Sequence, residues 1–292
     1  MQRASVILLT LDNIASIDSN TFKNIPNLQI LQLYTSDPNQ VFSFKFDLFA
    51  SSYNLLELYI IGTSITSLNQ AMFTSLSQLT DLQIQGNINS IDAKTFVNVR
   101  NLISLDLSHN QLSSISPSLF QNMYYLQILD LTSNNLVALD STQFKGLISL
   151  KELGLGSNHL SALPANLFSG LTWLNSLDLS NNSLTQIMGS SFKGCSNNNL
   201  LALDLSGNQI STVNVSAFSF ANLCDINVRY NQISLTSLTG QSFGSIKNMC
   251  AKYSIDLIGN PVLDVLTSKN VDIQSLCGSK KKCFIANTDN GN

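Results

Sequence analysis

Apolar residues recur along this chain with a fixed period of about 24 residues. One clear unit begins at Leu102 and places further apolar residues at Leu105, Leu107, Leu112, Ile115, Phe120 and Met123. A fixed period of this length is typical of a solenoid, in which each unit buries its hydrophobic face only by stacking on its neighbours. Extending the register in both directions gives about eleven units, which begin at Ala4, Leu28, Leu55, Leu79, Leu102, Leu126, Leu150, Leu174, Leu200, Leu223 and about Lys252.

The start of each unit predicts a short β-strand. In the pattern Leu-x-x-Leu-x-Leu the last two leucines alternate with period two, so both point to one face of a strand. Successive strands should then stack in parallel, and the chain should return through a convex side of loops, turns or short helices. We therefore predict an α/β solenoid with a parallel β-sheet on its concave face.

The repeat predicts two regions. Residues 1–261 form the array, whose first unit could be truncated, although residues 1–9 also resemble the start of a signal peptide. Residues 262–292 are assigned as a C-terminal cap and tail, because an uncapped terminal coil would expose its core and an open sheet edge.

An asparagine follows the strand in most units. A side-chain amide both donates and accepts, so it can satisfy backbone groups where the chain leaves the strand. Stacked asparagines should form a buried ladder, weaker in the first three units, where Asp12, Ser36 and Thr63 take this place. The predicted ladder consists of Asn87, Asn110, Asn134, Asn158, Asn182, Asn208, Asn231 and Asn260.

A phenylalanine occupies one equivalent late position in ten consecutive units. Its register predicts a spine of rings along the convex side of the core, with no aromatic ligand site needed to explain it. The spine comprises Phe22, Phe49, Phe73, Phe96, Phe120, Phe144, Phe168, Phe192, Phe218 and Phe243.

Composition narrows the range of functions. Hydrophobic residues make up 44% of the chain and charged residues only 11%, so the polar surface consists mainly of Ser, Asn, Thr and Gln. The net charge of −3 argues against a nucleic-acid partner, which usually requires a basic stripe. We see no apolar run long enough to span a membrane. Because no phosphate loop, catalytic triad or metal-ligand cluster is evident either, we expect no cofactor, no metal and no catalysis.

Two kinds of covalent modification are candidates. The chain has an odd number of cysteines, five, of which Cys250, Cys277 and Cys283 lie near the end and could include one disulfide. Glycosylation sequons begin at Asn181 and Asn214. Asn214 is the better acceptor, because a glycan on Asn181 would crowd the rim of the concave face.

These motifs resemble the leucine-rich-repeat family, in particular its 24-residue class with Leu-x-x-Leu-x-Leu-x-x-Asn-x-Leu and a late Phe. That class is typical of extracellular members such as Toll-like receptor ectodomains, small leucine-rich proteoglycans and lamprey variable lymphocyte receptors. The resemblance covers roughly residues 4–261 and implies a horseshoe that recognises ligands. The family's usual cysteine cap is in doubt, because no close cysteine pair follows Asn260 and Pro261.

The residues between the buried leucines should point out of the concave sheet. In the first units they form an apolar and aromatic patch that includes Gln32, Tyr34, Tyr59 and Ile61. We interpret the patch either as an interface core or as a surface that missing N-terminal repeats or a cap once covered.

Later units place acidic residues on the same face, and this strip includes Asp106, Asp130, Asp178 and Asp204. These residues are either ordinary occupants of a solvated strand position or a track for a cationic partner.

The sequence therefore favours a non-enzymatic protein-binding module, secreted or part of a receptor ectodomain, that recognises a macromolecular ligand on its concave face. Two other functions stay open: a structural or adhesive surface protein, and a targeting array of a longer enzyme. The oligomeric state is open as well.

Overall fold

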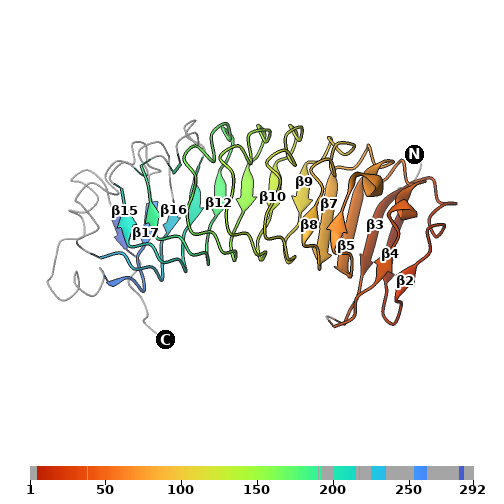
Figure 1. Ribbon diagram of the computed structural model, residues 1–292, viewed down its shortest axis with the longest axis horizontal. Helices are drawn as coiled ribbons and strands as arrows, with labels where there is room; N and C mark the ends of the chain where they lie inside the picture. The colour runs from red at the N-terminus through yellow and green to blue at the C-terminus, as the bar shows by residue number, and fades with distance from the viewer. Residues whose placement is uncertain are drawn as a thin grey trace. The chain divides into compact units, whose positions relative to one another are not determined.

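A computed structural model describes residues 5–37, 39–189, 191–192, 200–214, 217, 225–234, 253–261 and 283–285. The chain forms stacked coils, each with one strand in a parallel sheet (Figure 1). Two compact units are distinguished, unit 1 with residues 1–136 and 143–150, and unit 2 with residues 137–142 and 151–292. The predicted solenoid with a parallel sheet is confirmed.

The sheet of unit 1 follows the predicted coil starts. Its strands, in spatial order, are β1 (Ser5–Thr10), β3 (Leu28–Tyr34), β5 (Glu57–Thr63), β7 (Asp81–Gly86), β9 (Ser104–Asp106) and β10 (Ile128–Asp130). Neighbours are parallel, and Leu58 pairs with Leu31 on one side and Leu82 on the other. Because the three leucines are buried, the period-two pattern fixes both the register and the inner face.

Unit 2 continues the same design. Its strands are β11 (Glu152–Gly154), β12 (Ser176–Asp178), β14 (Ala202–Asp204), β16 (Asp225–Asn227), β17 (Tyr253–Asp256) and β18 (Cys283–Ile285). Strand β18 pairs in parallel with β17, so the predicted cap, 262–292, contributes a strand to the sheet. The other residues of that segment lie outside the described part of the chain.

The return side of the coils is built from short elements. Among the described residues it holds three two-stranded pairs: β2 (Ser16–Ile17) with β4 (Ser43–Phe44), β6 (Ser67–Leu68) with β8 (Ser90–Ile91), and β13 (Gln186–Ile187) with β15 (Thr212–Val213). Two 3-10 helices, η1 (Phe46–Phe49) and η2 (Gln70–Phe73), accompany them. In the described ranges these two are the only named helical elements, so the helical share of the predicted α/β solenoid is small.

Phenylalanine rings fill the core near the return side. The predicted spine residues that are described are all buried, namely Phe22, Phe49, Phe73, Phe96, Phe120, Phe144, Phe168 and Phe192. Ring centroids are 6.4 Å apart for Phe120 and Phe144 and 6.0 Å apart for Phe168 and Phe192. Phe218 and Phe243 lie outside the described residues.

Two further rings, Phe42 and Phe44, are buried beside this spine. Their centroids are 6.2 Å apart, and Phe44 contacts the ring of Phe49 edge-on at 5.5 Å. The repeat pattern did not single out this pair, because both rings lie in the second coil, which contains an insertion near residues 36–39.

The asparagines that follow the strands make the hydrogen bonds of a ladder. Asn182, for example, is buried and donates to the carbonyls of Leu155 at 2.9 Å, Leu179 at 3.2 Å and Ser180 at 3.1 Å. Its Oδ1 accepts the backbone N–H of Leu160 at 2.9 Å, so one side chain satisfies groups in two consecutive coils. The other buried asparagines at this position are Asn110, Asn134, Asn158, Asn208, Asn231 and Asn260.

Asn87 departs from the predicted ladder. It is only half-buried, and its Nδ2 has a long, 3.5 Å bond to the carbonyl of Thr63. In other coils the next asparagine of the ladder accepts the N–H that lies two residues after the preceding one, as Asn182 does from Leu160. Here Asn110 accepts the N–H of Ile88 at 3.1 Å, which lies two residues after Gly86 and only one after Asn87. This coil is one residue shorter than its neighbours, so Gly86 stands where the other coils place asparagine.

The residue before each ladder asparagine adopts a left-handed backbone conformation. The residues concerned, with φ from 50° to 73°, are His109, Ser133, Ser157, Asn181, Gly207, Tyr230 and Gly259. A positive φ is uncommon for residues other than glycine, so its recurrence identifies a built-in turn that brings the following amide into the core.

Candidate ligand-binding face

The sheet of unit 1 presents one face to solvent, here called its open face. Three columns of side chains cross it, each formed by equivalent positions on neighbouring strands. In the central column Gln32 pairs with Tyr59, Tyr59 with Gln83, Gln83 with Asp106, and Asp106 with Asp130. In a flanking column Tyr34 pairs with Ile61. Four predicted site residues, Gln32, Tyr34, Tyr59 and Ile61, are thus brought together on two strands.

The aromatic end of this face is partly enclosed. Tyr34 and Tyr59 are half-buried, whereas Ile61 is 37% exposed and Leu8, on β1, is 57% exposed. The Tyr59 hydroxyl donates to Glu57 Oε2 at 2.9 Å. Burial first, and then the hydrogen bond and charge of Glu57 and the charge of Asp81, raise the pKa of Tyr59 from 10.0 to about 12. The phenol is therefore neutral at physiological pH and offers an apolar ring with one polar end.

This shift predicts an alkaline titration that Tyr59→Phe removes. Because the folded-state pKa, about 12, lies above the ordinary 10.0, the associated stability is present below pH 10 and is lost as the pH rises from 10 through 12. Tyrosinate absorbance of the wild type should contain one late-titrating group that the variant lacks. If the titration curves of the wild type and Tyr59→Phe instead differ by a group with a pKa near 10, the raised pKa of Tyr59 is wrong.

The predicted acidic residues of unit 1 take part in the turn that ends each strand. Asp106 Oδ1 accepts the N–H of Ser108, and Asp130 Oδ1 accepts that of Thr132, both at 2.8 Å. The second oxygen of Asp106 accepts the side-chain amides of Gln83 at 2.7 Å and Gln85 at 3.2 Å. Each carboxylate thus has a local structural partner.

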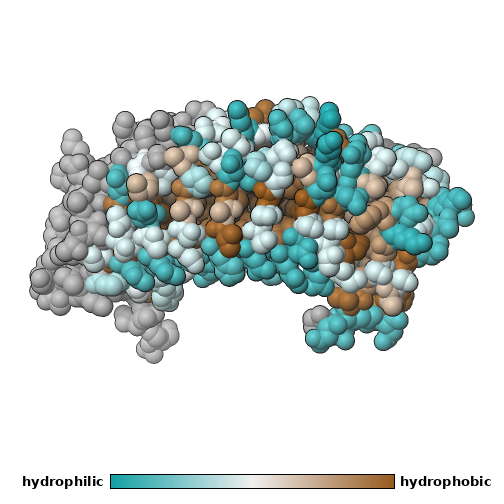
Figure 2. Space-filling model, in the orientation of Figure 1, coloured by the Kyte–Doolittle hydropathy of each residue, from teal (hydrophilic) through white to brown (hydrophobic). Residues whose placement is uncertain are grey.

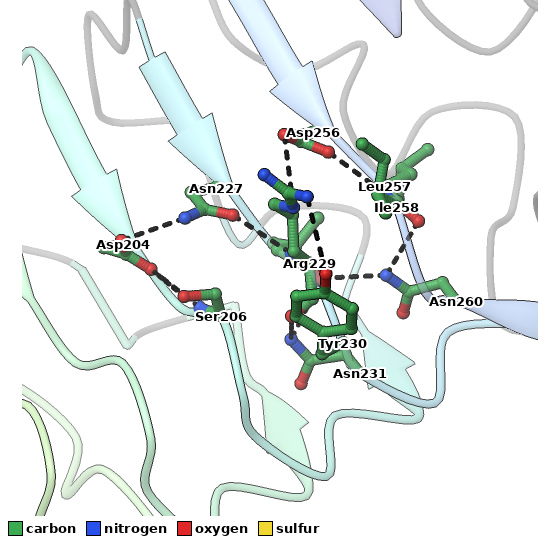
Figure 3. Close-up of polar contacts among 11 residues, drawn as sticks. Asp204, Ser206, Asn227, Arg229, Tyr230, Asn231, Asp256, Leu257, Ile258 and Asn260 are labelled. Atoms are coloured by element: carbon green, nitrogen blue, oxygen red, sulfur yellow. Dashed lines mark hydrogen bonds and ion pairs between the residues drawn. The ribbon is translucent and has the colours of Figure 1, made fainter. Parts of the chain in front are cut away.

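Unit 2 repeats this arrangement on its own open face. Asp178 pairs with Asp204 across neighbouring strands, and each accepts the N–H two residues further along the chain at 2.8 Å. Asn227 then donates to Asp204 Oδ2 at 2.9 Å. Arg229 Nε lies 3.7 Å from Asp256 Oδ2, as the close-up shows (Figure 3).

The structure divides the predicted acidic strip into two columns. Asp106, Asp130, Asp178 and Asp204 occupy the position whose carboxylate closes the turn after the strand. Asp256 belongs to the same column, because it pairs with Asn227 and Asn227 with Asp204, and its Oδ1 accepts the N–H of Ile258 at 3.1 Å. The neighbouring column holds further acidic residues, where Glu57 pairs with Asp81 and Glu152 with Ser176. The hydrogen bonds support the interpretation that the first four are regular strand occupants, while their outward oxygens still give the face its negative charge.

The candidate modification sites are described only in part. Asn181 and Asn214 are both exposed, and the Asn181 side chain lies against Gly207 at the strand end. Cys283 begins strand β18 and pairs with Tyr253, whereas Cys250 and Cys277 lie outside the described residues. The disulfide and the glycans therefore stay predictions.

Neither a metal-ligand cluster nor a membrane-spanning helix is found among the described residues. Within those ranges no group of three or more His, Cys, Asp or Glu side chains is placed to hold a metal ion. No helix in the same ranges is long and apolar enough to cross a membrane. On the face drawn in Figure 2, hydrophobic side chains lie among hydrophilic ones. Exposed aromatic residues such as Tyr125 and Trp173 lie outside the strands.

Stacked coils with a parallel sheet and an asparagine ladder define a solenoid repeat protein. The family model "Leucine rich repeat" matches residues 85–136, 124–184 and 173–233, which together are about half of the chain. The chain belongs to the leucine-rich-repeat family.

Comparisons with known proteins agree with this assignment. Human Toll-like receptor 5 is 35% identical over 101 residues, which are 33% of this chain and 11% of the receptor. The chain thus spans a small part of that relative.

Among solved structures, TLR13 in its complex with ssRNA13 has a TM-score of 0.68 at 22% identity, covering 85% of this chain and 40% of that one. An internalin from Listeria monocytogenes has a TM-score of 0.64 at 19% identity, covering 91% and 70%. The APL1 leucine-rich-repeat domain has a TM-score of 0.64 at 21% identity, covering 84% and 61%. These likenesses show the fold.

Proposed function

We propose that this chain is a non-enzymatic recognition module, secreted or part of a receptor ectodomain, that binds a protein ligand on the open face of its sheet. The observation that carries the proposal is the juxtaposition of Tyr34, Tyr59 and Ile61 on adjacent strands. Aromatic and aliphatic groups on a rigid surface are the usual anchors of protein interfaces. The likeness to Toll-like receptor 5 supports a receptor-type role.

Polar groups around these anchors support the same function. Gln32 lies beside Tyr59 and Glu57 holds the Tyr59 hydroxyl, so the apolar patch has a polar surround that can hydrogen-bond a partner. The negative charge further along the face favours a partner with basic groups and disfavours nucleic acid. TLR13 was nevertheless solved with ssRNA13, so RNA belongs among the probes.

The test is a binding screen on an array of purified secreted and cell-surface proteins, with single-stranded RNA as a separate probe. Changing Tyr34, Tyr59 and Ile61 together to Ser should weaken binding of the partner by at least about tenfold, as expected for interface anchors. The matched control changes Tyr53, Tyr124 and Ile148, exposed residues of the same unit outside the strands, to Ser.

Circular dichroism should show that both variants are folded. If the open-face variant binds its partner as tightly as the wild type, the proposed face is wrong. If RNA binds and no protein does, the nature of the partner is wrong.

A further inference from the structure

A surface pocket of unit 2 lies at the margin of the sheet. Its lining residues are Lys151, Trp173, Asn175 and Leu201, and its volume is about 170 Å³. Trp173 is 60% exposed and Leu201 is 44% exposed, so two large apolar side chains meet at one surface site. The pocket belongs neither to the core nor to the columns of the open face.

Three consecutive coils build this pocket. Lys151, Asn175 and Leu201 occupy the same repeat position, directly before strands β11, β12 and β14. The N–H of Asn175 donates to the carbonyl of Lys151 at 2.8 Å, and the N–H of Leu201 to the carbonyl of Asn175 at 2.9 Å. Trp173 stands between Leu171 and Leu174, both buried. Backbone bonds and buried neighbours therefore hold the four residues in place without a ligand.

Trp173 also departs from the residue type that this repeat position usually holds. In unit 1 the equivalent Asn54 and Asn101 each donate their amide to a carbonyl of the preceding coil, Pro26 at 2.8 Å and Ser77 at 3.0 Å. An indole lacks the amide's carbonyl oxygen, and its one N–H is carried on a much larger ring. A small coil-bridging amide is thus replaced by a large exposed aromatic surface, as it also is at the equivalent Tyr125, and this surface is available for contact with another molecule.

The size of the pocket and its lining define what fits. Its volume is several times the roughly 30 Å³ of a water molecule but below the 300 Å³ or more of a typical small-ligand site, so one side chain suits it. Trp173 and Leu201 supply the apolar walls. Lys151 offers ammonium donors, and the Asn175 amide both donates and accepts, so the margin can hydrogen-bond both the carbonyls and the N–H groups of a peptide backbone.

The neighbouring open face indicates the charge of the ligand. Among described residues of unit 2, that face carries Glu152, Asp178, Asp204, Asp225 and Asp256. The one basic side chain of its described strands and turns, Arg229, is paired with Asp256. We propose that the Trp173 pocket anchors one large apolar side chain of a protein ligand whose adjoining residues, over the sheet, are basic. This inference rests on the proposed function and names the chemistry of its ligand.

The experiment uses Trp173 as its own reporter, because it is the only tryptophan of the chain. Tryptophan emission of the full chain is followed during titration with a synthetic glycine-rich peptide that carries one leucine followed by three lysines. We expect a saturable blue shift, weaker binding at high salt, and an affinity about tenfold lower in Leu201→Ser. Met188→Ser, an exposed residue of unit 2 outside the pocket lining, should bind as the wild type does.

Matched peptides and sugars make the outcome decisive. A peptide with alanine in place of leucine, or glutamate in place of lysine, should give at least about tenfold weaker binding. Equal binding of either peptide, or no saturable shift at millimolar leucine peptide, overturns the proposal, and so does a saturable shift with methyl glycosides alone. A partner from the array that still depends on Tyr34, Tyr59 and Ile61 would then show that the proposed function stands without this pocket.

Discussion

Replacing Phe168 by Ala should lower the free energy of unfolding of unit 2 by about 3–5 kcal/mol, the usual cost of emptying a ring-sized space in a core. The ring is fully buried and stacks on Phe192 with centroids 6.0 Å apart and an interplanar angle of 10°. The coils on each side cannot close the gap, because the backbone hydrogen bonds between coils fix their spacing. Both the lost burial and the residual cavity therefore contribute.

Urea unfolding followed by circular dichroism measures this loss. Phe168→Leu keeps most of the apolar volume and should lose clearly less than Phe168→Ala. Met188→Ala, at a side chain that is 49% exposed, should change stability by no more than about 0.5 kcal/mol. If Phe168→Ala lowers the free energy of unfolding by less than about 1 kcal/mol, the buried phenylalanine spine does not stabilise the fold as proposed.

Most of the fold followed from the sequence because one physical rule is repeated. Each Leu-x-x-Leu-x-Leu segment places two side chains on one face of a strand, and the same face must be buried in every coil. The coil starts at Leu28, Leu102 and Leu174 accordingly fall at or just before strands of the sheet. A wrong assignment in one coil does not shift the others, since each neighbouring coil fixes its own register.

The departures occur where the period changes. The coil between Leu79 and Leu102 is one residue short. Counting from Leu79 therefore assigns the ladder position to Asn87, whereas the hydrogen bonds place Gly86 there. In the second coil an insertion brings Phe42 and Phe44 into the core at positions that the repeat does not define. The repeat period predicts which residues of successive coils are equivalent. The exact position of an insertion or deletion within a coil becomes clear only from the packing and hydrogen bonds of the folded chain.

The sequence predicted which residues lie on the candidate face, but not the hydrogen bonds that they make there. Strand alternation sufficed to place Tyr34, Tyr59 and Ile61 on one surface. The turn-closing bonds of residues such as Asp106 and Asp178 depend on backbone geometry at the strand end, and alternation carries no information about it. Trp173 did carry a signal, an aromatic residue where coils such as those of Asn54 and Asn101 have asparagine, but its exposure emerges only from the coil geometry.

Replacing Asn182 by Ala should cost about 3 kcal/mol, near the upper end for a buried polar group left without its partner. The side chain is buried and makes four hydrogen bonds to backbone groups of two coils, so its removal leaves these groups without their partner. Asn87→Ala is the matched control, since the half-buried Asn87 makes only a long bond to Thr63 and accepts from the exposed Gln111. That variant should lose less than about 1 kcal/mol.

Asn182→Asp separates the donor role of the amide from its size. An ionised carboxylate could still accept the N–H of Leu160, but its oxygens would face the carbonyls of Leu155, Leu179 and Ser180. Burial and these carbonyls should raise its pKa above the ordinary value of about 3.9. Stability should therefore fall as the pH rises through that value and up to the folded-state pKa, and stay low above it. Urea unfolding at several pH values checks this slope relative to the wild type. A variant as stable as the wild type at neutral pH would show that donation by the Asn182 amide does not hold the coils together.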